Sequence, residues 1–126
     1  MERRRISSGS PYEPAFGFSR ALVVGSNVYV SGTAPVMPDG EDLPSDAYSQ
    51  ARRCLEIIVG ALAEAGASAA DVVRTRIYVK RADVWEDVAR AHAEVFGDVR
   101  PAATAVVTEL LDPRWLVEIE AEAVVA

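Results

Sequence analysis

The sequence feature that most constrains this chain is a strict alternation near its C-terminal end. Apolar residues at every second position from Val117 to Val125 alternate with Glu118, Glu120 and Glu122. A period of two is typical of a β-strand, and it places the apolar side chains on one face and the carboxylates on the other. Carboxylates that share a face repel one another unless the face is in water or cations lie opposite. The pattern therefore predicts a strand with one buried face, and an acidic face that is either simply solvated or has a specific polar role.

A strand over residues 72–80 (VVRTRIYVK) has the complementary pattern. Its predicted apolar face carries Val73, Thr75, Ile77 and Val79. Its other face carries Arg74, Arg76, Tyr78 and Lys80. If both strands lie in one sheet, this basic face is the natural partner of the acidic face. Because an exposed ion pair contributes only about 0–1 kcal/mol, the pairing would fix the register of the strands more than their stability.

Glycines and prolines divide the rest of the chain. Strands are predicted over residues 20–24 and 27–31, with a two-residue hairpin turn between them. Residues 32–45 are predicted to form a long loop, a kind of segment that is often functional. Residues 1–15 are predicted to be an extended arm that is loose at its tip. Residues 100–125 are predicted to form two strands joined by a short turn.

Two helices are predicted from apolar positions spaced three and four residues apart. The first spans residues 46–65, with Ser45 as its N-cap and Gly66 as its C-terminal stop. Its apolar stripe consists of Ala47, Ala51, Cys54, Leu55, Ile58 and Leu62. A capping box in residues 83–86 (DVWE) is predicted to open the second helix, which continues to about Phe96.

The single cysteine and the single histidine both lie on these helical stripes. Cys54 is interpreted as a small core residue rather than a reactive thiol, because the stripe buries it. His92 is either a hydrogen-bonded packing residue, which the pattern favours, or a catalytic base. One cysteine permits no internal disulfide, and this set of potential ligands argues against a zinc site made by the protein alone.

Composition limits the classes of function. The chain has 126 residues and a formal net charge of −6, and it lacks the basic patch that nucleic-acid binding would need. An acidic chain is equally unsuited to an anionic membrane surface, and no apolar run is long enough to span a bilayer. No phosphate-binding glycine loop is present, so we expect no cofactor and no metal. The lack of a secretory signal and of paired cysteines predicts a cytoplasmic protein.

The predicted elements follow the order β-β-α-β-α-β-β, without an internal repeat. This order predicts an α+β fold with two layers, a mixed β-sheet carrying two helices on one face. Residues 1–126 would form a single domain with residues 1–15 as its N-terminal arm. The other face of the sheet would be bare and would combine the charged residues with exposed apolar surface. In so small a protein a bare sheet face predicts an oligomer.

Five short blocks of the sequence, taken in order, resemble the reactive-intermediate deaminase family (Rid, or YjgF-like), which is also labelled L-PSP endoribonuclease. The blocks are residues 30–35 (VSGTAP), 50–52 (QAR), 73–80 (VRTRIYVK), 100–102 (RPA) and 117–121 (VEIEA). The resemblance implies a chorismate-mutase-like fold that assembles as a homotrimer, with clefts between neighbouring subunits. It further implies hydrolysis of small imines, the tautomers of enamines such as 2-aminoacrylate, to a 2-keto acid and ammonia.

The same resemblance implies which residues line the cleft. Glu120 matches the family glutamate that positions water, and Ser31 and Gly32 match a Ser-Gly turn that lines the pocket. Thr33 stands where many members have glutamine. Phe18 stands where many members have tyrosine, so a hydroxyl is missing there.

The departure from the family is Ala103, which occupies the position of the arginine that grips the substrate carboxylate; Ala105 lies nearby on the same predicted strand. Alanine cannot replace a guanidinium, whose hydrogen bonds to a charged group contribute about 1.5–3 kcal/mol each. We expect Arg20 to supply the positive charge instead, the alternative being that Arg20 is a surface charge at a strand edge. Arg100 is a weaker candidate, because strand alternation points it to the opposite face from Ala103.

Two functions from different classes follow from the resemblance. The first is an enzyme that deaminates an imine or enamine other than simple 2-aminoacrylate, with Glu120 acting on water and Arg20 supplying charge. The second is a trimer that only binds a small metabolite or regulates a partner. Cleavage of RNA, which the alternative family label suggests, ranks below both because of the acidic charge balance.

Overall fold

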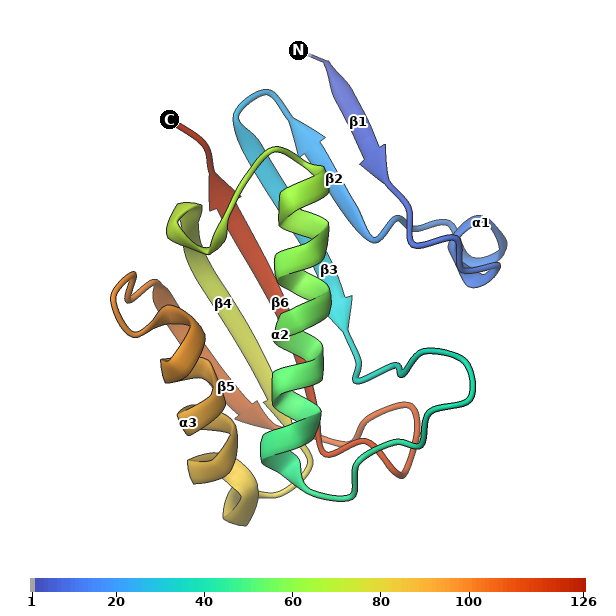
Figure 1. Cartoon of the computed structure of the whole chain (residues 1–126), viewed down its shortest axis with the longest axis vertical. Helices are drawn as coiled ribbons and strands as arrows, with labels where there is room; N and C mark the ends of the chain where they lie inside the picture. Colours follow the sequence, from blue (N-terminus) through green and yellow to red (C-terminus); the bar gives the residue numbers. More distant parts are fainter. Residues whose placement is uncertain (1) are drawn as a thin grey trace.

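The computed structural model describes residues 2–126, in which a six-stranded β-sheet carries two long helices on one face (Figure 1). The strand order across the sheet is β1-β2-β3-β6-β4-β5. The strands are β1 (Arg3–Ile6), β2 (Ala21–Val24), β3 (Asn27–Thr33), β4 (Val72–Val79), β5 (Ala102–Val107) and β6 (Val117–Val124). The α-helices are α1 (Tyr12–Phe16), α2 (Ala47–Glu64) and α3 (Trp85–Phe96), and short 3-10 helices lie at Ala69–Asp71 and Ala82–Val84.

The sheet is mixed, as the sequence predicted. β4 and β5 run parallel, and the other neighbouring strands run antiparallel. Parallel neighbours need a crossover connection, and α3 supplies it between β4 and β5. α2 connects β3 to β4 and lies across the middle of the sheet (Figure 1). The predicted α+β fold with two helices on one face is confirmed, and from Ala21 onward the elements follow the predicted order.

The core lies between the helices and one face of the sheet. Leu55, Ile58 and Leu62 of α2 belong to the same buried cluster as Ile77 of β4 and Ile119 of β6, and each is at most 1% exposed. Burying a side chain of this size contributes about 1.5–3 kcal/mol relative to leaving it exposed. Period-two burial in β6 therefore turns the three glutamates of that strand toward the face that the helices leave open.

Cys54 and His92 have the packing roles that their positions predicted. Cys54 is fully buried, and burial raises the pKa of its thiol. Nε2 of His92 lies 2.9 Å from Oγ1 of Thr75, and the imidazole ring stacks at a tilt on Phe96. Burial lowers the pKa of His92, so the ring stays neutral between α3 and the sheet.

The N-terminal arm is more ordered than the sequence analysis predicted. β1 pairs with β2 at the edge of the sheet, and Ile6 is buried there. Three consecutive arginines give β1 no period-two signal, but charged side chains are common on edge strands. After β1, the carboxylate of Glu13 in α1 accepts hydrogen bonds from Ser7 and Ser8, which folds the segment back on itself.

The helix ends differ in part from the predicted ones. The N-cap of α2 is Asp46, not Ser45, and its carboxylate accepts a hydrogen bond from the backbone N–H of Ser49. Gly66 ends α2 as predicted, with a left-handed φ of 84°. The predicted capping box of α3 is wrong, because no side chain caps that helix and Asp83 pairs with Arg81 instead.

Two strand predictions also need correction. A bulge at the start of β4 buries Val72 and leaves Val73 46% exposed, so Val73 is not on the core face. Residues 100–125 do contain two strands, but they are not joined by a short turn. In the sheet, β4 lies between β5 and β6. Residues 108–116 therefore connect β5 to β6 past the end of β4.

Candidate functional site

The basic face of β4 meets the acidic face of β6 on the open side of the sheet, as the alternating patterns predicted. In the antiparallel register, Arg74 lies opposite Glu122, Arg76 opposite Glu120 and Tyr78 opposite Glu118. Neighbouring positions on two strands bring side chains within about 4.5–5.5 Å at Cβ, close enough for ion pairs. These paired charged side chains of β4 and β6 are called the charged ladder below, and the candidate site is built around them.

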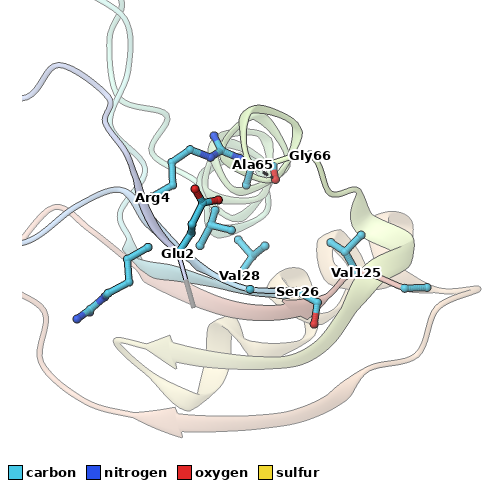
Figure 2. A pocket seen from close by; sticks show the side chains of 11 residues that line it. Glu2, Arg4, Ser26, Val28, Ala65, Gly66 and Val125 are labelled. Atoms are coloured by element: carbon cyan, nitrogen blue, oxygen red, sulfur yellow. Dashed lines mark hydrogen bonds between the residues drawn. The ribbon is translucent and has the colours of Figure 1, made fainter.

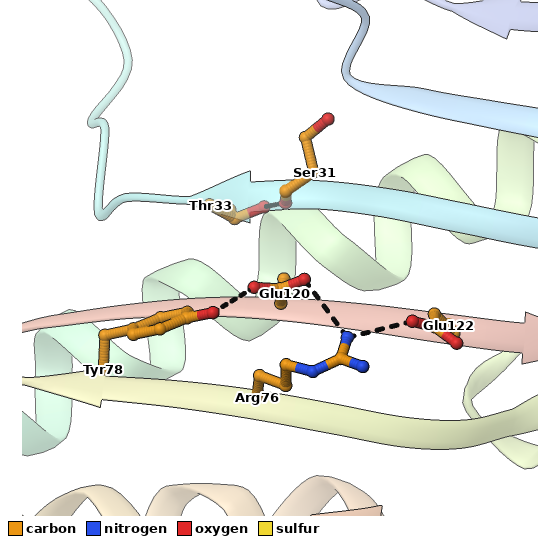
Figure 3. Close-up of polar contacts among 6 residues, drawn as sticks. All are labelled: Ser31, Thr33, Arg76, Tyr78, Glu120 and Glu122. Atoms are coloured by element: carbon orange, nitrogen blue, oxygen red, sulfur yellow. Dashed lines mark hydrogen bonds and ion pairs between the residues drawn. The ribbon is translucent and has the colours of Figure 1, made fainter. Parts of the chain in front are cut away.

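Two neighbours on β4 hold Glu120 (Figure 3). Nη1 of Arg76 lies 3.4 Å from Oε2 of Glu120 and 2.9 Å from Oε1 of Glu122, so one guanidinium bridges two carboxylates. The Tyr78 hydroxyl donates a hydrogen bond to Oε1 of Glu120. The hydrogen bond with Glu122 is the main cause that raises the pKa of Arg76, and the one with Glu120 is the main cause that raises the pKa of Tyr78. The Glu120 carboxylate is thus fixed at both oxygens.

Glu118, two residues earlier, has a different environment. It is half-buried and lies against Gly32 of β3, where an added Cβ would fall 2.5 Å from Oε2 of Glu118. Burial raises the pKa of Glu118; the charge of Arg20 opposes this shift and that of Glu120 adds to it. The sequence alternation placed Glu118 on the open face but gave it no separate role.

Arg20 lies just before β2 and holds the irregular end of β3. Its Nη2 donates to the backbone carbonyl of Ser31 at 3.0 Å and to that of Gly32 at 2.7 Å. Its Nε is buried without a hydrogen-bond partner among residues 2–126. Burial lowers the pKa of Arg20, while the carboxylates of Glu13 and Glu118 favour its charged form. The guanidinium is therefore a structural cation placed beside Glu118.

The Ser-Gly pair belongs to a strand rather than to a turn. Ser31, Gly32 and Thr33 are the last residues of β3, where the pairing with β6 shifts register. The Ser31 hydroxyl donates to the carbonyl of Ser19, and the side chain points away from Glu120 (Figure 3). Thr33 is fully buried and its hydroxyl donates to the carbonyl of Ser31. Both hydroxyl groups thus stabilise the irregular end of β3.

A cavity of about 250 Å³ opens beside the two glutamates. It is lined by Tyr78, Glu118, Glu120 and residues 108–111 (TELL). The connection after these residues is anchored by Gln50 of α2, which is 1% exposed. Gln50 donates to the carbonyls of Pro44 and Arg114 and accepts from the N–H of Leu116. The cavity therefore has one rigid wall of strands and one wall of loop, and sequence reasoning identified only Glu120 among its residues.

The structure does not bring every predicted site residue to this cavity within one chain. Phe18 is 43% exposed and lies between α1 and β2. Ala103 and Ala105 lie on the edge strand β5, opposite Thr75 and Ile77 in register. That register directs both alanines toward the helix side of the sheet, the opposite side from Glu120, although neither is covered. β4 also lies between β5 and β6, so the strand order itself keeps Ala103 and Ala105 away from Glu120.

A larger cavity of about 680 Å³ lies elsewhere, between β1, the β2–β3 hairpin and the end of α2 (Figure 2). Arg4 crosses it and donates hydrogen bonds to the carbonyls of Glu64 and Ala65 at the C-terminal end of α2. A cation at a helix C-terminus satisfies carbonyls that have no partner within the helix. The polar contacts of Arg4 in this cavity are therefore explained by capping of the C-terminal end of α2.

Two further searches gave negative findings for residues 2–126. Their His, Cys, Asp and Glu side chains form no group of three or more that could hold a metal ion. Their helices include none with the length and hydropathy needed to cross a membrane.

The two-layer α+β fold matches that of the YjgF-like class of proteins. A sequence model described as Endoribonuclease L-PSP matches residues 9–125, so the chain belongs to this family, known also as Rid or YjgF. It is 46% identical to Rv2704 of Mycobacterium tuberculosis, a YjgF/YER057c/UK114 family member, with a TM-score of 0.89 over 98% of this chain and 100% of that one.

Two other relatives extend the comparison. An uncharacterized protein of Streptomyces coelicolor is 40% identical over 121 residues, which cover 95% of this chain and 90% of that protein. The crystal structure of TdcF from E. coli, which contains bound serine, is 25% identical with a TM-score of 0.81, covering 98% of this chain and 94% of that one.

Proposed function

We propose that this protein hydrolyses small imines, the tautomers of enamines derived from amino acids, to a carbonyl compound and ammonia. The observation that carries the proposal is Glu120, which lies in the wall of a 250 Å³ cavity with its carboxylate held by Arg76 and Tyr78. A carboxylate fixed in this way is suited to orient a water molecule and accept its proton. The serine bound to TdcF supports a ligand of amino-acid size in this fold.

The substrate is proposed to differ from simple 2-aminoacrylate. Ala103 provides no guanidinium, and Nη2 of Arg20 already donates to two backbone carbonyls. Arg20 can still supply positive charge to the site through space, but it lacks the two-pronged geometry with which arginine binds a carboxylate. A substrate whose carboxylate is masked or absent fits this site better than a free 2-amino acid imine.

A homotrimer is proposed as the functional form. The open sheet face exposes Tyr29, Val106 and Val124 beside the charged ladder, and every residue of β5 is exposed. Exposed apolar surface of this kind is typical of a face covered by another subunit. A neighbouring copy would add its own strand edge to the cavity, which is how Phe18, Ala103 and Ala105 could come to line it.

The test is release of ammonia from imines generated in solution by an amino-acid oxidase. The wild-type protein should accelerate hydrolysis of at least one imine in a panel that includes esters and amides of the parent amino acids. Glu120→Gln should reduce the rate by about 10²–10⁴-fold, the usual contribution of general acid–base catalysis. Glu56→Gln is the matched control, because Glu56 is an exposed carboxylate on α2 paired with Arg53. Equal rates for wild type and Glu120→Gln would reject the enzyme.

A binding or regulatory trimer is the second candidate, and the occupied Nη2 of Arg20 favours it. It predicts that serine or a 2-keto acid raises the melting temperature while the imine panel shows no turnover. The net charge of −6 disfavours RNA cleavage, which highly purified protein should not catalyse. A cytoplasmic location is proposed for either candidate, since the one cysteine is buried and free.

A further inference from the structure

Three glutamates line the cavity on the open face of the sheet, and two of them, Glu118 and Glu120, lie on β6 while Glu109 lies on the loop wall. Glu118 and Glu120 occupy alternate positions of β6, so their Cα atoms lie roughly 6.5 Å apart and their side chains leave the sheet in the same direction. Their surroundings differ in a way that suits two different protonation states.

Glu120 is surrounded by groups that stabilise negative charge. It accepts from the Tyr78 hydroxyl and lies within ion-pair distance of Arg76. Glu118 packs instead against Gly32, where an added Cβ would fall 2.5 Å from its Oε2. Among the described residues no hydrogen bond holds the Glu118 carboxylate. The charges that act on it are those of Arg20 and Glu120, and the titratable side chains of Tyr78 and Glu109 line the same cavity; Cys54 lies across the sheet in the core.

The balance of these groups shifts Glu118 toward its protonated form. Burial raises its pKa, and the negative charge of Glu120 acts in the same direction. Arg20 acts in the opposite direction, but its guanidinium is held by the carbonyls of Ser31 and Gly32 and donates no hydrogen bond to Glu118. Paired carboxyl groups in unlike environments commonly divide into an acid and a base.

We propose that Glu118 is a second catalytic residue, which donates a proton to the imine nitrogen while Glu120 accepts a proton from the attacking water. This role rests on the proposed deaminase function. The geometry that carries it is the pair of carboxyl groups facing one cavity, one held by Arg76 and Tyr78 and the other packed against Gly32 beside Arg20.

The proton transfers balance over one turnover. Glu118 protonates the C=N nitrogen as water adds to the carbon, and Glu120 takes the water proton; this gives a neutral carbinolamine, an ionised Glu118 and a protonated Glu120. Glu120 then protonates the amine, the C–N bond breaks, and ammonia leaves as Glu118 recovers the hydroxyl proton. Both residues return to their starting states, and one water has been consumed for one ammonia released. Arg20 stabilises the transient Glu118 carboxylate.

The experiment compares wild type, Glu118→Gln, Glu120→Gln and Glu56→Gln in the ammonia-release assay across pH. Wild-type kcat/KM should fall on the alkaline side as Glu118 loses its proton. Glu118→Gln should be slower by about 10²–10⁴-fold and should lose the alkaline limb. Glu56→Gln should match wild type in rate and profile.

A second measurement does not depend on turnover. In ¹³C NMR of glutamate-labelled wild type, one carboxyl carbon should titrate above the ordinary value of about 4.3, and that signal should be missing from Glu118→Gln. Normal titration of all glutamates, or turnover by Glu118→Gln with an unchanged profile, would overturn the role of Glu118 alone. Absence of turnover by wild type would overturn the deaminase function together with this role.

Discussion

Gly32 sets the position of the Glu118 carboxylate, because only the absence of a side chain lets Oε2 approach so closely. A Cβ at this position would fall 2.5 Å from that oxygen, a distance that real contacts of this kind do not show. The end of β3 is held by Arg20 and Ser31, so the backbone at Gly32 resists movement. The flexible carboxylate is therefore the group that must shift.

Gly32→Ala is expected to displace Glu118 from the cavity with little loss of stability. The turnover rate should fall by at least tenfold, while the free energy of unfolding should change by less than about 1.5 kcal/mol, since only a side-chain end moves. Gly60→Ala is the control, because nothing lies within 4 Å of its added Cβ. Replacing this helical glycine should stabilise the protein by about 0.5–1 kcal/mol and leave turnover unchanged. Rate assays and urea titration of both variants check the prediction, and equal rates would contradict it.

At the residue scale, sequence reasoning predicted the side-chain contacts and burial that follow from the period of a strand or a helix. The ion pairs of Arg76 follow from two alternating strands in one sheet, and the buried Cys54 follows from its place on a helical stripe. The contact between Gly32 and Glu118 could not be predicted in this way. It depends on a register shift between β3 and β6, which no local pattern in the sequence marks.

At the scale of secondary-structure elements, Gln50 links three segments that are distant in the sequence. Its amide bonds to the carbonyls of Pro44 and Arg114 and to the N–H of Leu116. One side chain on α2 therefore satisfies the loop before that helix and the connection between β5 and β6. The block of residues 50–52 entered the family resemblance as a sequence match, and this clamp is a physical reason for glutamine there.

Gln50→Ala is expected to lower the free energy of unfolding by about 2–4 kcal/mol. The substitution leaves two carbonyls and one N–H without partners at a buried site, and each such group costs about 1–3 kcal/mol with partial relief from water. Arg52→Ala is the matched control on the same helix, since its ion pair with Glu94 at 3.7 Å is solvent-exposed and contributes no more than about 1 kcal/mol. Chemical denaturation measures both, and equal losses would show that the clamp is not stabilising.

Elements with a regular spacing of apolar residues or clear turn residues were predicted from the sequence, and elements without these signals were missed. α2, α3, the β2–β3 hairpin and β6 all have apolar spacing or turn residues that local rules interpret correctly. β1 has a single buried residue, Ile6, and joins the sheet only because β2 offers an edge. The placement of β4 between β5 and β6 is likewise a property of topology, which the order of elements along the chain does not specify.

At the scale of the whole molecule, the helices cover only one side of the sheet (Figure 1). The open side combines the ladder of Arg76, Glu120 and Glu122 with exposed apolar side chains, including Val106, which lies opposite Tyr78 in register and is 44% exposed. A surface of this composition costs free energy in water, and covering it with another subunit removes that cost. The cavity beside Glu120 opens on this same side, so assembly and activity should be coupled.

Val106→Arg is therefore expected to break the proposed homotrimer and abolish turnover together. Arginine at this position would bring an unpaired charge into an apolar contact, which typically costs several kcal/mol. Sedimentation equilibrium should give three copies of 13.5 kDa for wild type and a smaller species for the variant. Ala63→Arg is the control, because Ala63 is exposed on α2, away from the open face, and should leave both mass and rate unchanged. A Val106→Arg protein that stays trimeric would place the subunit contact elsewhere, and a monomeric variant with full activity would show that a single chain completes the site.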